Sequence, residues 1–205
     1  MKLVDRWLYR RPFEGAGARR YAAQERPAFG DLDERLIAQW PALASARRLI
    51  DVGAGPAVFA ARVRDRHPQV RVVCVEPSRD LARAPAVRAV AEALPFAGAS
   101  FDLALCLSSI RHVRDRARAL AELRRVVRDG GALWIVELDP AADRARCANH
   151  AAGLGSRALR IAFRPLVVRT APSADEIARD ARVAGWHVEA PSADPVQPVY
   201  VLRCS

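Results

Sequence analysis

Two carboxylates beside a glycine-rich turn are the residues best placed to do chemistry. An apolar, strand-like run ends in Asp51-Val-Gly-Ala-Gly55, which puts Asp51 directly before Gly53 and Gly55. Glycines let the backbone approach a ligand closely, and the first turn of a following helix adds unpaired N–H donors. Glu76 ends the next apolar run, about 20 residues further on, which is the spacing of a strand–helix–strand unit. A carboxylate there can accept hydrogen bonds from both hydroxyls of a ribose, so the pattern predicts a nucleoside site.

The same residues argue against a dinucleotide. The pattern G-x-G-x-x-G needs a third glycine or alanine where this chain has Val58. Asp51 would also repel a pyrophosphate, whereas it would attract a cofactor with a cationic amino-acid part. The site therefore favours a nucleoside attached to a cationic group.

The elements that position these residues alternate between strands and helices from Arg47 onward. Such alternation predicts an α/β, doubly wound, mostly parallel sheet. A loop alone joins the last two strands, so the final strand is expected to run antiparallel. The expected strands are Leu49–Val52, Val70–Val75, Ala86–Val90, Asp102–Leu107, Ala132–Leu138, Trp186–Glu189 and Val199–Leu202.

The expected helices are marked by apolar spacing and by capping residues. A short helix covers Asp33–Gln39, Pro56 occupies the first turn of the next, and a third begins at Ser78. The clearest helix covers Val113–Val127 and ends at Gly130-Gly131. Ser173 and Glu176 form a capping box that opens a late helix, which stops at Gly185.

Composition narrows the class of protein. The chain has 205 residues, 51% of them hydrophobic and 27% charged, as in an ordinary globular domain. No apolar run approaches the roughly 20 residues that span a bilayer, and the first residues lack the apolar segment of a secretory signal. We therefore expect a cytoplasmic protein without a membrane partner.

The net charge of +10 comes almost wholly from arginine, since Lys2 is the single lysine. This skew is typical of high-GC codon usage, and nucleic acid is not the expected partner. The four cysteines form no C-x-x-C pair, and no further ligands cluster near Cys147 and His150. No metal site is predicted.

Five blocks, in this order and spacing, resemble class I S-adenosylmethionine-dependent methyltransferases, most closely the branch of ubiquinone/menaquinone-type and other small-molecule enzymes. The resemblance covers about residues 47–139. The blocks are Leu49–Gly55, Val75-Glu76-Pro77-Ser78, Ala91–Phe96, Ser100-Phe101-Asp102 and Gly130–Leu133.

The resemblance implies S-adenosylmethionine as cofactor and an in-line transfer of its methyl group to a small molecule. It implies that the glycine loop cradles the methionine part, that Glu76 holds the ribose and that Ala91-Glu92 flanks the adenine. The chain departs from the family at Ala57, where the loop's third glycine is usual, and at Val90, where aspartate is common. The full predicted cofactor set is Asp51, Gly53, Ala54, Gly55, Glu76, Pro77, Ala91, Glu92, Leu107 and Ser108.

The acceptor is expected beyond the fourth strand. There the candidate catalytic residues are Arg111 and His112, with Tyr21 contributed by a helical lid over residues 1–46. Residues 47–205 form the Rossmann-like domain. Aromatic residues and arginines in the lid, Tyr9 among them, suit a hydrophobic acceptor that bears an acidic group.

Two other functions stay open. A nucleic-acid methyltransferase would agree with the charge. However, the amino-directed subtype carries an Asn/Asp-Pro-Pro-aromatic run where this chain has Leu107-Ser-Ser-Ile110. The departures at Ala57 and Val90 also allow a non-catalytic relative that binds a cofactor or a partner protein.

Overall fold

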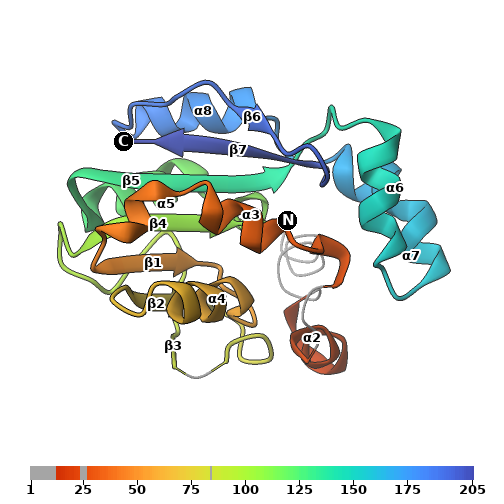
Figure 1. Cartoon of the computed structure of the whole chain (residues 1–205), viewed down its shortest axis with the longest axis horizontal. Helices are drawn as coiled ribbons and strands as arrows, with labels where there is room; N and C mark the ends of the chain where they lie inside the picture. The colour runs from red at the N-terminus through yellow and green to blue at the C-terminus, as the bar shows by residue number, and fades with distance from the viewer. Residues whose placement is uncertain (1–12, 24–26, 84) are drawn as a thin grey trace.

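A seven-stranded sheet organises the chain, as predicted (Figure 1). The computed structural model describes residues 13–23, 27–83 and 85–205. The strand order is β3-β2-β1-β4-β5-β7-β6. β7 pairs antiparallel with both β5 and β6, and the remaining pairs are parallel, so the antiparallel last strand is confirmed. The strands are β1 Arg48–Val52, β2 Arg71–Val75, β3 Ala86–Val87, β4 Phe101–Leu107, β5 Val127–Leu138, β6 Ser192–Ala193 and β7 Val199–Cys204.

The helices lie on both faces of the sheet (Figure 1). The α-helices are α2 Gly15–Ala22, α3 Leu32–Ala38, α4 Val58–Arg66, α5 Arg116–Val126, α6 Arg144–Ala152, α7 Arg157–Ala162 and α8 Ala174–Val183. Shorter helical turns are η2 Pro27–Phe29, η3 Pro41–Ala44 and η4 Ile110–His112, and η5 Phe163–Val168 is a π-helix. The predicted capping box at Ser173 and Glu176 is present and opens α8.

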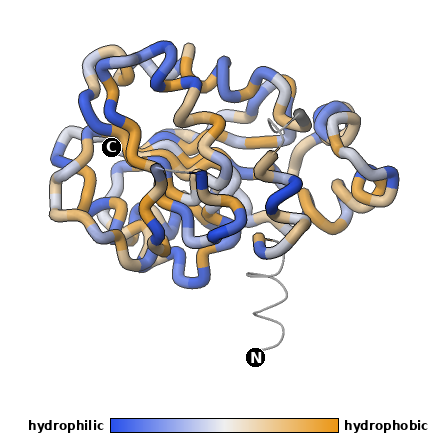
Figure 2. Tube along the Cα trace, turned by 90° about the horizontal axis from the view of Figure 1, so that it is seen from below, coloured by the Kyte–Doolittle hydropathy of each residue, from blue (hydrophilic) through white to orange (hydrophobic). Residues whose placement is uncertain are grey.

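Alternate residues of the strands fill two separate cores. Leu49 and Trp134 point to the face covered by α3 and α4, where Trp134 stacks on Trp40 with ring centroids 4.5 Å apart. Ile50 points to the opposite face, covered by α5 and α8, where the Trp186 indole N–H donates to the Leu120 carbonyl at 3.1 Å. In Figure 2 the hydrophobic colour runs through the middle of the molecule. Both faces of the central strands are therefore buried, as parallel sheets require.

One predicted helix is absent, and two predicted helix boundaries were wrong. No helix follows Ser78: its hydroxyl accepts from the Asp80 and Leu81 N–H groups, and the chain turns instead. Pro56 precedes α4, whose N-cap is Ala57. The helix predicted over Val113–Val127 is shorter, covering Arg116–Val126.

Strand boundaries differ as well. β5 begins at Val127, so Gly130-Gly131 lies inside it rather than capping α5. There a Cβ on Gly131 would meet the Asp102 carbonyl oxygen at 2.5 Å. β3 is only Ala86–Val87. The predicted strand Trp186–Glu189 is reduced to a bridge from Val188 to Cys204, and β6 lies at Ser192–Ala193.

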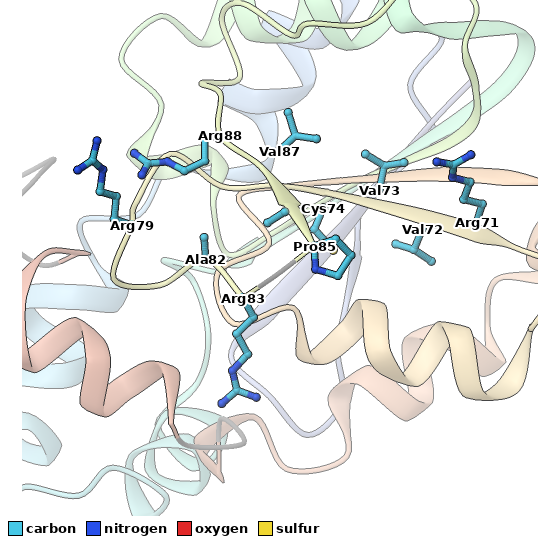
Figure 3. A pocket seen from close by; sticks show the side chains of 11 residues that line it. Arg71, Val72, Val73, Cys74, Arg79, Ala82, Arg83, Pro85, Val87 and Arg88 are labelled. Carbon is cyan, nitrogen blue, oxygen red and sulfur yellow. The ribbon is translucent and has the colours of Figure 1, made fainter.

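No helix lies between β2 and β3 in the described residues, and β3 forms the edge of the sheet. A cavity of about 580 Å³ lies against this edge, lined by backbone and side chains of β2, β3 and the turn between them. Figure 3 shows Val73 and Val87 on the strands, with Arg79 and Arg88 together at one side and Arg83 directed away. The Arg88 guanidinium donates to the Pro77 carbonyl at 2.9 Å.

Within the described residues, no helix is long and apolar enough to cross a membrane.

Candidate active site

A cavity of about 760 Å³ lies at the carboxyl ends of β1, β2 and β4. Ligands in open α/β sheets bind at this edge, where the strand order reverses. Every residue of the predicted cofactor set lines the cavity: Asp51, Gly53, Ala54, Gly55, Glu76, Pro77, Ala91, Glu92, Leu107 and Ser108. The structure thus brings together residues from four separate stretches of sequence.

The glycine loop is shaped by the loop that follows β4. Gly53 has a φ of +76°, and a Cβ there would lie 2.4 Å from the Cβ of Ser109. The Ser109 hydroxyl donates to the Val52 carbonyl at 2.8 Å, which fixes the two loops against each other. Gly53 therefore cannot be replaced without moving Ser109. Ala57 also has a positive φ, +57°, although it carries a side chain.

Glu76 is buried and lines the cavity. Its Oε2 accepts from the Gly55 N–H at 2.9 Å, and its Oε1 accepts from the Ser78 N–H at 2.8 Å. A carboxylate has about four acceptor positions, so each oxygen keeps one for a ligand. Burial raises the pKa of Glu76, and the two N–H groups oppose that rise.

The region predicted to flank an adenine also lines the cavity. Glu92 Oε1 accepts from the N–H groups of Arg114 and Asp115 at 3.0 and 3.3 Å, so it supports the turn before α5. Val90 also lines the cavity, and 47% of its surface is exposed.

Ser108 is strained at the end of β4. Its φ is +52°, and among the described residues its buried hydroxyl has no hydrogen-bond partner. Non-glycine residues adopt this conformation at a cost of about 1–3 kcal/mol, and such strain gathers at functional sites. Together with Asp51, Gly53 and Glu76, this hydroxyl gives the cavity the polar groups that fit a nucleoside joined to a cationic amino acid.

Aromatic side chains also line the cavity. His112 contacts the ring of Phe13 edge-on, with centroids 4.6 Å apart, and Tyr21 and Phe29 line the same space. Burial, aided by the neighbouring Arg111, lowers the pKa of His112 to about 4, so its imidazole is neutral at pH 7. Tyr9 lies outside the described residues.

Arg111 is placed differently from His112. Its guanidinium donates to the Val167 carbonyl at 3.0 Å, and it is absent from the described residues that line the cavity. Its backbone N–H donates to Glu137 Oε2 at 3.3 Å. Glu137 is fully buried at the end of β5, where burial raises its pKa to about 7. Sequence reasoning missed Glu137 because it falls within an apolar strand-like run.

Helix α2 is fastened over the cavity by the turn after β2. The Gly15 N–H donates to Asp80 Oδ2 at 2.6 Å, and Arg19 pairs with Asp80 at 2.7 Å. The Ser78 hydroxyl donates to the Phe13 carbonyl, and Arg83 donates to the Ala22 carbonyl. These contacts put Phe13 and Tyr21 against the site. Phe29 was not foreseen, and the sequence holds no signal for it.

No group of three or more His, Cys, Asp or Glu side chains within the described ranges could hold a metal ion. His150 instead shares a hydrogen bond with Gln197 at 2.8 Å.

Comparisons with known proteins agree with this geometry. Residues 50–135 match the family described as "Methyltransferase domain". A demethylmenaquinone methyltransferase of Deinococcus radiodurans is 36% identical over 110 residues, covering 48% of this chain and 46% of that protein. A malonyl-[acyl-carrier protein] O-methyltransferase of Geobacter sulfurreducens is 35% identical over 95 residues, 41% of this chain and 36% of that protein.

The chain therefore spans less than half the length of these curated relatives. The crystal structure of an S-adenosylmethionine-dependent methyltransferase from Aquifex aeolicus superimposes with a TM-score of 0.66. It covers 87% of this chain and 92% of that one, and at 12% identity it supports the fold alone. Residues 50–135 thus match a methyltransferase domain, and the fold around them is shared with an S-adenosylmethionine-dependent methyltransferase.

Proposed function

We propose that this protein transfers a methyl group from S-adenosylmethionine to a hydrophobic small molecule bound beside His112. One observation carries the proposal: the carboxylates Asp51 and Glu76 and the aromatic side chains of Phe13, Tyr21 and Phe29 line a single cavity. The carboxylates suit a cationic nucleoside cofactor, and the aromatic side chains suit an apolar acceptor.

The residues act mainly by positioning. When bound, the cofactor would supply a methyl group on a positively charged sulfur, and Glu76 and Asp51 would hold it at the glycine loop. Holding two reactants in an attack geometry is worth roughly 7–11 kcal/mol.

His112 is our candidate general base. An acceptor O–H or C–H that becomes methylated loses its proton, and the neutral imidazole of His112 accepts it and passes it to solvent. Burial holds the pKa of His112 at about 4, so the base is always available at pH 7 but is weak. It therefore suits an acceptor that is itself acidic. Tyr21 is proposed to orient the acceptor, and Arg111 to position the loop that carries His112, through its bond to Val167.

The relatives indicate the chemical class of the acceptor. One is named for a demethylmenaquinone and the other for a malonyl group on an acyl-carrier protein. The aromatic wall favours a ring-bearing acceptor of the first kind. If the acceptor also bears an acidic group, the arginines of the cavity that could pair with it are Arg88, Arg114 and Arg118.

We also propose that α2, within the lid predicted over residues 1–46, covers the site of the domain formed by residues 47–205, and that the protein works in the cytoplasm. α3 and Trp40 instead pack in the core of that domain. The fastening of α2 to Asp80 supports the lid.

The test is transfer of labelled methyl groups to a panel of hydroquinones, aliphatic thioesters and RNA. We expect label in the hydroquinones alone. Replacing His112 by Gln should lower kcat, but by less than the roughly 10²- to 10⁴-fold that a general base with a pKa near the working pH supplies, while S-adenosylhomocysteine binds within a few fold of the parent protein. The matched control is His67→Gln, at the end of α4. Label in RNA at physiological salt would contradict the small-molecule acceptor.

A further inference from the structure

The segment that follows α6 exposes large aliphatic side chains. α7 runs directly into the π-helix η5, and α7 itself has no buried residue. Leu159, Ile161 and Leu166 are 55%, 71% and 68% exposed. Single exposed aliphatics are common, but three of them within eight residues, on and beside a helix with no buried residue, are more than a monomer usually leaves exposed to solvent.

Arginines accompany these side chains without any acidic residue. The 31 residues between Asp143 and Asp175 contain six arginines and no Asp or Glu. Arg157, Arg160 and Arg169 are exposed beside the aliphatic residues. The surface of residues 157–169 is therefore both apolar and cationic, and we call it the apolar–arginine surface.

Aromatic contacts link this surface to the cavity. Phe29, which lines the cavity, contacts His150 of α6 edge-on with ring centroids 4.9 Å apart. His150 in turn stacks on Phe163, the first residue of η5, at 4.6 Å. Figure 1 shows α6 and α7 standing out beyond the end of the sheet. The apolar–arginine surface is thus a projecting part of the molecule on the side where the acceptor is expected.

We propose that the apolar–arginine surface binds the face of an anionic lipid bilayer. Exposed aliphatic residues beside arginines can insert at the boundary of headgroups and acyl chains while the guanidinium groups pair with anionic headgroups. The surface fits a protein partner less well, because it projects from the molecule and lacks the Trp and Tyr side chains that anchor protein interfaces. The sequence analysis expected no membrane partner because no apolar run is long enough to span a bilayer. Binding to the surface of a bilayer does not require such a run.

The proposal goes beyond methyl transfer, and its test needs neither cofactor nor acceptor. The full chain is sedimented with vesicles of phosphatidylcholine, alone or mixed equally with phosphatidylglycerol. We expect at least about tenfold stronger binding to the anionic vesicles, since each arginine near the surface contributes. The triple variant Leu159→Ser, Ile161→Ser, Leu166→Ser should lose at least about tenfold of that binding.

The matched control is Val183→Ser on α8, where the side chain is 80% exposed but lies outside the apolar–arginine surface. It should bind vesicles like the parent protein. S-adenosylhomocysteine binding and the melting temperature check that the variants are folded. Unchanged vesicle binding by the triple variant, or no binding by the parent, would overturn the proposal. So would a parent dimer in sedimentation velocity that the triple variant abolishes, because the surface would then join two copies of the chain.

Discussion

The Gly55 N–H donates to Glu76 Oε2 at 2.9 Å, so the end of β2 holds the glycine loop that follows β1. The other oxygen of Glu76 holds the Ser78 N–H. One carboxylate thereby sets the shape of two loops and also faces the cavity. Its proposed role as a ligand for a ribose and its role in shaping the loop cannot be separated by a single substitution to alanine.

Glu76→Gln keeps the size of the side chain and removes its charge. Hydrogen bonds to a charged acceptor contribute roughly 1.5–3 kcal/mol, so S-adenosylhomocysteine should bind about 10- to 100-fold more weakly by calorimetry. The melting temperature should fall less than in Glu76→Ala, which frees both N–H groups. Exposed Glu189→Gln is the control. Unchanged affinity would show that Glu76 only shapes the loop.

Ala57→Gly should stabilise the protein. Ala57 has a φ of +57°, a conformation that costs a residue with a Cβ about 1–2 kcal/mol. Glycine removes this cost but gains freedom in the unfolded chain, so the free energy of unfolding should rise by about 0.5–1 kcal/mol in urea titrations. Ala61→Gly, within α4, should instead lose about 1 kcal/mol. A lower free energy of unfolding in both variants would show that the positive φ of Ala57 is not a source of strain.

The features predicted most accurately from the sequence are those set by residues close together along the chain. The strand ending at Val52, the glycine loop and Glu76 could be identified because apolar runs and carboxylates follow one another at fixed spacing. Ser78 misled because its hydroxyl does accept two N–H groups, as a helix cap would, yet the chain turns away after Leu81. Phe29 and Glu137 could not be identified, since only tertiary packing brings Phe29 to the cavity and buries a carboxylate beside Arg111.

Val90→Asp should strengthen cofactor binding. Val90 lines the cavity and is 47% exposed where the family often has aspartate. A carboxylate that accepts from the adenine amine should tighten S-adenosylhomocysteine binding roughly tenfold. Val196→Asp, a half-exposed valine outside the cavity, should leave the affinity unchanged. Weaker binding in Val90→Asp would argue that the adenine lies elsewhere.

Glu137 should make stability depend on pH. Burial raises its pKa to about 7, whereas in the unfolded chain the value is near 4.5. The folded protein therefore retains a proton that the unfolded chain has released, and stability falls as the pH rises from about 4.5 to about 7. The loss over this range is roughly 3 kcal/mol.

Glu137→Gln removes this titration. Its unfolding free energy should change little between pH 5 and 8 in urea titrations, apart from groups common to both proteins. The amide can still accept from the Leu138 N–H, which donates to Glu137 Oε1 at 2.8 Å in the parent protein. An equal pH slope in parent and variant would assign the dependence to other groups.

The fastening of α2 should control the acceptor more than the cofactor. Asp80 accepts from the Gly15 N–H and from Arg19, and both contacts lower its pKa, so it is charged at neutral pH. Asp80→Ala removes both contacts and loosens the helix that carries Tyr21, with Phe13 just before it. We expect KM for the acceptor to rise about tenfold, the effect of losing about 1.4 kcal/mol of binding, while S-adenosylhomocysteine affinity stays within a few fold. Exposed Asp65→Ala, on α4, is the control.

Deleting residues 1–25 should go further and abolish transfer, because the deletion removes Phe13 and Tyr21. Full activity in that truncation would remove the lid from the mechanism and leave the acceptor to the walls formed by Phe29 and His112.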